Sequence, residues 1–161
     1  MNDLSTIQFN IYYMLKDLFP HYNVILGEEN AQKVEGDTIF LHRIVTTNSP
    51  LQLGVGLIRK IVFAIDVFSS NGVIHDDVVS IIMDRFYNSG ARIYNYTPID
   101  GNANFPYNPP ESNIVNESYE PIVWGFMDFT ECYANDILDE VLQKIVYKRT
   151  CCEITVVYAK E

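Results

Sequence analysis

The sequence predicts a single α+β domain, 1–161, with a mainly antiparallel mixed sheet and helices packed on it. Two amphipathic segments, 4–18 and 74–86, carry apolar residues at helical spacing. Between and after them lie short segments rich in Val, Ile, Phe and Tyr, which favour strands. The length of 161 residues is that of one domain, and no repeat or low-complexity linker divides the chain.

The first helix is expected over 4–18. Its apolar residues form one stripe, consisting of Leu4, Ile7, Ile11, Met14/Leu15 and Leu18. Ser5 and Gln8 fit a capping box at its start, and Pro20 ends it. Strands are then predicted over 23–26 and 38–45, joined by a polar loop.

The segment 57–68 predicts a central strand, because both of its faces are apolar. One face carries Ile61, Phe63, Ile65 and Val67, and the other carries Val62, Ala64 and Phe68. The preceding segment 46–56 contains Pro50, Gly54 and Gly56 and is expected to be a loop. If 38–45 and 57–68 pair antiparallel, this loop is the tip of a projecting hairpin.

The second helix is predicted from apolar residues at helical spacing, namely Ile74, Val78, Ile81, Ile82 and Phe86. Asp76 and Asp77 are expected to complement its dipole, and Gly90 to supply a left-handed stop. Further strands are expected over 91–96, 113–117, 122–133 (with a bulge near Gly125) and 152–158. Apolar doublets over 137–146 favour a helix.

The segment 97–112 is the clearest loop, with four prolines and an aromatic centre at Phe105 and Tyr107. It is too aromatic for a simple spacer, so we interpret it either as an arm that orders against a partner or as a surface loop. Eleven Tyr and nine Phe in the whole chain suit protein contacts.

The formal net charge of −10 argues against gripping a nucleic-acid backbone or an anionic membrane. No apolar stretch is long enough to span a bilayer, and the first residues show no signal peptide. The three cysteines, Cys132, Cys151 and Cys152, are odd in number and are expected to be free thiols in a reducing compartment. We expect no cofactor.

The residues that could carry chemistry are few. His21, His42 and His75 are too widely spaced for a zinc motif, so we expect surface or half-buried histidines and no metal site. Asp66 interrupts an apolar strand and has two interpretations.

In the first interpretation, Asp66 begins a metal-dependent nuclease site with Asp84 or Asp128. In the second, which we favour, it is a structural carboxylate that meets solvent, an arginine or a backbone amide. Asp66 and Asp128 are expected to face each other across the sheet or to bind Arg43 or Arg59.

The order of elements resembles the small neck proteins of tailed bacteriophages, the tail terminator or tail-completion group. The resemblance covers roughly residues 4–133. It begins with the capped helix and the segment 24–30, followed by a strand that contains Arg43. The tract Ile65-Asp66-Val67-Phe68 is similar to the Val-Asp-Val-Tyr strand end common in that group, and Met127-Asp128-Phe129 also has a counterpart.

The resemblance implies a structural virion protein without catalysis, made in the host cytoplasm. Members form a ring, usually a hexamer, that caps the tail tube and docks onto the head connector. Genomic DNA would pass through the lumen without specific binding, and no membrane is involved. The candidate interface residues are Pro50, Leu51, Leu53, Phe105, Tyr107, Pro109, Asp66 and Arg43. The alternatives are a metal-dependent nuclease using Asp66 and a monomeric adaptor that binds proteins through the aromatic loop.

Overall fold

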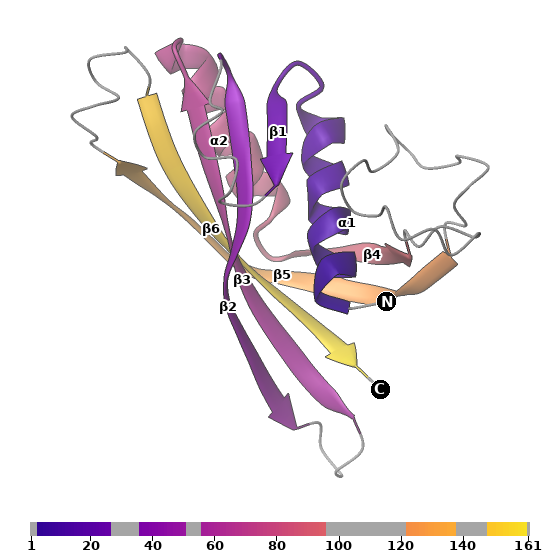
Figure 1. Cartoon of the computed structure of the whole chain (residues 1–161). Coiled ribbons are helices and arrows are strands. Elements are labelled where there is room, and N and C mark those ends of the chain that lie inside the picture. Colours follow the sequence, from indigo (N-terminus) through magenta and orange to yellow (C-terminus); the bar gives the residue numbers. More distant parts are fainter. Residues whose placement is uncertain (1–2, 27–35, 51–55, 96–121, 138–147, 161) are drawn as a thin grey trace.

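The computed structural model has two helices and a six-stranded sheet in the part of the chain that it describes (Figure 1), which confirms the predicted α+β class. The described residues are 3–26, 36–50, 56–95, 122–137 and 148–160. The helices are α1 (Asp3–Leu18) and α2 (Gly72–Arg85). The strands are β1 (Asn23–Leu26), β2 (Thr38–Pro50), β3 (Leu57–Ser69), β4 (Ser89–Asn95), β5 (Ile122–Ile137) and β6 (Lys148–Lys160).

The strand order is β1-β2-β3-β6-β5-β4. Only β1 and β2 pair in parallel, and every other neighbouring pair is antiparallel, as predicted. The sheet is strongly twisted and curls around α1, which contacts β1 and β2 near one edge and β4 at the other (Figure 1).

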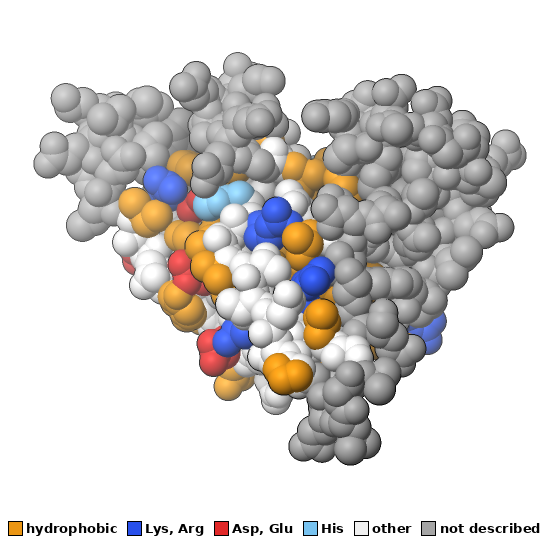
Figure 2. Space-filling view, turned by 60° about the horizontal axis from the view of Figure 1, so that its bottom comes forward, with side chains coloured by type: hydrophobic (Ala, Val, Ile, Leu, Met, Phe, Trp, Pro, Cys, Tyr) orange, Lys and Arg blue, Asp and Glu red, His pale blue; other side chains and the backbone are white. Residues whose placement is uncertain are grey.

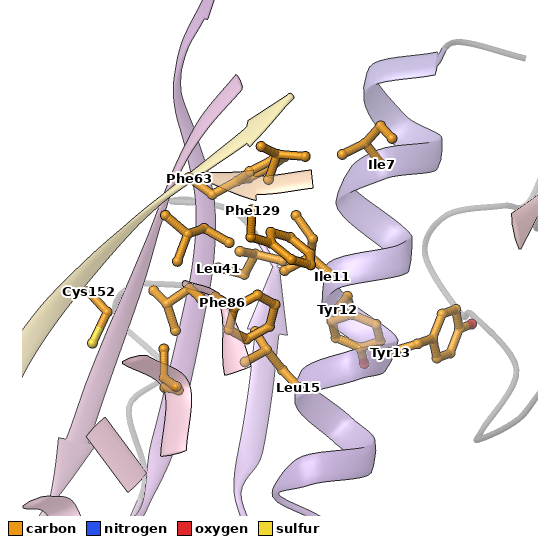
Figure 3. Packing of buried hydrophobic residues seen from close by; sticks show 14 of the residues in the cluster. Ile7, Ile11, Tyr12, Tyr13, Leu15, Leu41, Phe63, Phe86, Phe129 and Cys152 are labelled. Atoms are coloured by element: carbon orange, nitrogen blue, oxygen red, sulfur yellow. The ribbon is translucent and has the colours of Figure 1, made fainter. Parts of the chain in front are cut away.

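Because the sheet curls around it, α1 is buried over more than one stripe. Ile7, Ile11 and Leu15 are fully buried as predicted, and Tyr13 is buried on another side of the helix (Figure 3). Leu18, expected in the apolar stripe, is exposed instead. The helix begins at Asp3, so the predicted cap at Ser5 is wrong, because Ser5 lies inside the first turn.

The predicted hairpin is confirmed, because β2 and β3 pair antiparallel from Thr38–Phe68 to Pro50–Leu57. Residues 46–50 extend β2, so the loop predicted over 46–56 begins later than expected. Proline has no backbone N–H to donate. Pro50 is tolerated because this part of β2 is an edge strand, with a hydrogen-bonded neighbour on one side only among the described strands. A bulge interrupts the register between Arg43 and Val45.

The central position predicted for β3 is also confirmed, since it lies between β2 and β6. Phe63, Ile65 and Val67 belong to the core beneath the two helices. Ala64 and Phe68 are buried on the opposite face of the sheet.

The ends of α2 differ from the prediction. The cap is Asn71, whose side chain accepts hydrogen bonds from the backbone N–H groups of Val73 and Ile74 at 3.0 and 3.2 Å. The left-handed residue after the helix is Asn88, with φ of 46°, and not Gly90. Gly90 lies in β4, where an added Cβ would approach the carbonyl oxygen of Met127 to 3.2 Å.

The last strands are longer than predicted. β5 continues to Ile137, so a helix does not begin there, and β6 covers 148–160 instead of 152–158. The predicted bulge near Gly125 is present, because the register with β4 passes from Gly125 to Val123. The predictions for the loop 97–112, the strand 113–117 and the rest of the helix over 137–146 fall outside the described residues.

One hydrophobic core joins both helices to one face of the sheet. At its centre, the rings of Phe86 and Phe129 meet edge to face with centroids 4.9 Å apart (Figure 3). Among the described helices, neither is both long and apolar enough to cross a membrane.

Candidate interaction surfaces

The first candidate surface is the outer part of the β2–β3 hairpin, which we define as residues 43–50 and 56–62. β1 pairs with β2 only as far as Leu41. Beyond that point, no described strand pairs with the outer edge of β2. Every residue from Arg43 to Pro50 is exposed, including Ile44 at 45% and Val45 at 47%. An open strand edge next to exposed aliphatic side chains is a template for contact with another chain.

This hairpin is also positively charged. The sequence 43–62 holds Arg43, Arg59 and Lys60 and none of the 21 acidic residues of the chain. Arg59 Nε donates a hydrogen bond to Asn48 Oδ1 at 2.9 Å, which links the two strands. Figure 2 shows Lys and Arg side chains, together with some Asp and Glu, among hydrophobic ones on the face seen from the hairpin end. The hairpin therefore differs in charge from the chain as a whole.

The structure places the predicted interface residues in different settings. Arg43 and Pro50 are exposed on the hairpin, whereas Asp66 is only 5% exposed. The other predicted interface residues lie outside the described part of the chain, namely Leu51, Leu53, Phe105, Tyr107 and Pro109.

Asp66 lies in a polar cluster on the sheet face away from the helices, beside Cys151 of β6 in register. His42 Nε2 is 3.2 Å from Asp66 Oδ2, and Arg149 Nη2 is 3.4 Å from Asp66 Oδ1. Burial by itself raises the pKa of Asp66. Hydrogen bonding from His42 and the charge of Arg149 outweigh that effect, so the pKa lies below the usual aspartate value.

The favoured interpretation of Asp66 as a structural carboxylate agrees with this geometry, although its partner is Arg149. The expected pairing with Arg43 or Arg59 is wrong. Arg43 lies opposite Phe63 and Arg59 opposite Asn48, both nearer the hairpin tip than Asp66.

The acids that the nuclease alternative requires lie elsewhere. Asp128 is opposite Val157, six residues along β6 from Cys151, the neighbour of Asp66. Asp84 is exposed on α2, across the sheet from Asp66. Within the described residues, no group of three or more His, Cys, Asp or Glu side chains is placed to hold a metal ion.

The three cysteines are free thiols, as predicted. Burial raises the pKa of Cys132 to about 11 and that of Cys152 to about 12. Burial and the neighbouring Asp66 carboxylate raise the pKa of Cys151 to about 12. These thiols therefore remain protonated near neutral pH, which is the opposite of what a cysteine nucleophile needs.

The histidines are only partly as expected. His21 is exposed and His42 is half-buried, but His75 on α2 is fully buried. His75 Nδ1 lies 3.1 Å from Asp76 Oδ1. His75 thus belongs to the inner face of the helix.

The second candidate surface is the outward face of α2, which the sequence pattern did not reveal. Val78, Ile82 and Phe86 are buried as predicted, but Ile74 and Ile81 are exposed at 45% and 43%. The five apolar residues that predicted the helix are therefore divided between the core and the surface. The adjacent pair Ile81-Ile82 was the available signal, because neighbouring residues on a helix cannot share one narrow face.

No protein-family model matches the chain, and no curated protein matches it.

Proposed function

We propose that this chain is a structural protein of a bacteriophage neck, which forms a ring that caps the tail tube and joins it to the head connector. The observation that carries the proposal is the projecting β2–β3 hairpin, with its open edge and exposed aliphatic side chains. The proposed role is structural and needs no catalytic residue, cofactor or metal.

The hairpin is suited to contact between subunits. A two-stranded projection has little core of its own, so its stable use is to pack on another surface. In a ring, one surface of each subunit meets a different surface of its neighbour. A hairpin that extends past β1 provides such a surface without disturbing the core around α1 (Figure 1).

The charge of the chain supports the same role. A net charge of −10 disfavours tight binding to DNA, because phosphates are repelled by carboxylates. A ring with an acidic lumen would let genomic DNA slide through without adhering. An acidic lumen would therefore suit the passage of DNA through the ring.

The proposal is tested by electron microscopy of the purified chain mixed with tail tubes of the phage that encodes it. We expect ring-shaped density at one end of each tube. Val45→Glu, which places a negative charge on the cationic hairpin, should remove that density. Leu18→Glu makes the matched change at an exposed apolar residue outside the hairpin and should retain it.

Bare tube ends with the wild-type chain would contradict the proposal. If the chain also sediments as a monomer, the monomeric adaptor becomes the better interpretation. If the chain cleaves DNA in the presence of a divalent metal and Asp66→Ala loses this activity, the metal-dependent nuclease becomes the better interpretation.

A further inference from the structure

We propose that the outward face of α2 in one copy of this chain receives the outer β2–β3 hairpin of a second copy. We define this α2 face by the exposed residues Val73, Ile74, Asp77, Ile81 and Asp84. The inference rests on the proposed function, because it specifies how neighbouring subunits of the ring meet.

The first argument is that the apolar residues of α2 extend beyond the side that it buries. The buried side holds Val78 and Ile82 in the core. Outside it, Val73 is 73% exposed, and Ile74 and Ile81 are also exposed. A helix on the surface of a monomer is normally polar where it faces solvent, and a group of exposed apolar side chains marks a contact surface. We therefore take this exposed part of α2 as a contact surface.

The second argument is that this face is negatively charged. Positions 74, 77, 81 and 84 are spaced three and four residues apart, so they form one stripe in which Ile alternates with Asp. The neighbouring cation, Arg85, lies over the rings of Phe86 and Phe129 and so serves the inner side of the helix. The α2 face thus combines aliphatic contact area with acidic side chains.

The third argument is that the hairpin has the complementary properties. Ile44 and Val45 provide aliphatic contact area. The exposed Lys60 shares a sheet face with Val45, because it lies two residues from Val62, the partner of Val45 in register. The exposed Arg43 directly precedes Ile44 in the chain and adds a second cation to the hairpin. Pairing two hairpins would bring like charges together, and so would pairing two α2 faces. Charge therefore selects the contact between unlike surfaces.

The fourth argument is the position of the two surfaces. α2 begins three residues after β3 ends, whereas the hairpin turn precedes the start of β3. Since β3 has 13 residues, these ends lie about 43 Å apart at about 3.3 Å per residue. Figure 1 shows the hairpin end and α2 at opposite ends of the molecule. One copy cannot join its own two surfaces, so the contact is head to tail, as in a ring or filament.

The test uses charge reversal on each surface and sedimentation velocity at low salt, where exposed charges are least screened. The hairpin variant is Arg43→Glu/Lys60→Glu, and the helix variant is Asp77→Lys/Asp84→Lys. All four residues are exposed, and circular dichroism verifies folding. The wild-type chain should form higher species at high concentration, whereas each variant alone should remain monomeric.

An equal mixture of the two variants should restore association. The reversed hairpin of one variant then meets the reversed helix of the other, and the two unmodified surfaces also match. The control is Asp128→Lys/Glu131→Lys on β5. It carries the same charge change as the helix variant, and it lies beside the exposed Phe126 and Tyr133. This control should associate as the wild type does.

Three results would overturn the contact: a monomeric wild-type chain at high concentration, unchanged association in both variants, or a mixture that stays monomeric. Failure of the contact and failure of the function are distinguishable. Restored association without tube capping keeps the contact and removes the neck role. Tube capping by both variants alone keeps the neck role and removes the contact.

Discussion

The side-chain amide of Asn10 on α1 binds the backbone N–H and C=O of Tyr94 on β4 through two hydrogen bonds. Asn10 Nδ2 donates to Tyr94 O, and Tyr94 N donates to Asn10 Oδ1, each at 2.8 Å. Asn10 Nδ2 also donates to Thr6 O at 2.8 Å. Tyr94 lies where the register between β4 and β5 shifts. The buried Asn10 side chain therefore hydrogen-bonds the backbone of this edge strand in the way that a neighbouring strand would.

Replacing Asn10 should therefore loosen the contact between α1 and the β4 edge. In Asn10→Leu, the partly buried N–H and C=O of Tyr94 lose their hydrogen bonds to Asn10, and we expect a loss of about 2 kcal/mol in the free energy of unfolding. Urea denaturation measures this loss. Asn135→Leu, at an exposed position of β5, should stay within about 0.5 kcal/mol of the wild type. Equal effects of the two changes would show that the Asn10 bonds add little.

The Asp66 cluster should make stability depend on pH in the acidic range. Because the pKa of Asp66 is lowered in the folded chain, its contribution is complete above the unfolded value of about 3.9 and is lost as pH falls through the folded pKa. Asp66→Asn should cost about 2 kcal/mol at pH 7. The difference from the wild type should narrow below about pH 4.

Urea titrations at several pH values measure this difference. Asp128→Asn is the matched control, because Asp128 is exposed on β5. Because it is a surface substitution, it should change the free energy of unfolding little. A deficit of Asp66→Asn that stays constant down to pH 2 would contradict the assigned ion pair.

The three thiols should react slowly in the folded chain. Burial raises the pKa of each cysteine to about 11 or 12, so the thiolate fraction at pH 8 is on the order of 10⁻³ or less. Iodoacetamide should label them much faster in urea than in buffer. Ser70→Cys adds an exposed thiol as a positive control, and it should be labelled at once. Rapid labelling of the native wild-type chain would contradict these environments.

Substitutions at two adjacent residues of α2 should differ in their effect on stability, because one residue is buried and the other is exposed. Ile82 is fully buried, so Ile82→Ala should lower the free energy of unfolding by about 3 kcal/mol. Ile81 is substantially exposed, so Ile81→Ala should have a much smaller effect on a dilute monomer. Thermal denaturation at low concentration measures both. Similar losses would mean that the outer side of α2 is covered within the monomer.

The sequence predicted the parts of the fold that local patterns determine. Apolar residues on both faces of β3 identified a central strand. The antiparallel pairing of β2 with β3, on which the projecting hairpin depended, is present in the structure. The extension of β2 to Pro50 was missed because proline usually signals a loop, although an edge strand admits it. The cap at Asn71 was missed because the apolar pattern of α2 begins after it.

The candidate surfaces were only partly predictable. Pro50 was identified because it lies in the expected hairpin loop, 46–56. Arg43 was identified because it lies in the strand that carries the family resemblance and was a possible partner of Asp66. The outward face of α2 was not, since an apolar residue gives the same signal whether it faces the core or a partner. The pairing of Asp66 with Arg149 depends on the sheet order β3-β6, which joins segments far apart in the chain and which no local pattern specifies.

The central claim is that this chain caps a tail tube, and the length of growing tubes tests it most directly. Purified tail-tube protein of the encoding phage is polymerised with increasing amounts of the chain, and tube lengths are measured by electron microscopy. The account predicts that tubes become shorter as the chain is added and that each carries a ring at one end. Tubes of unchanged length with bare ends would contradict it.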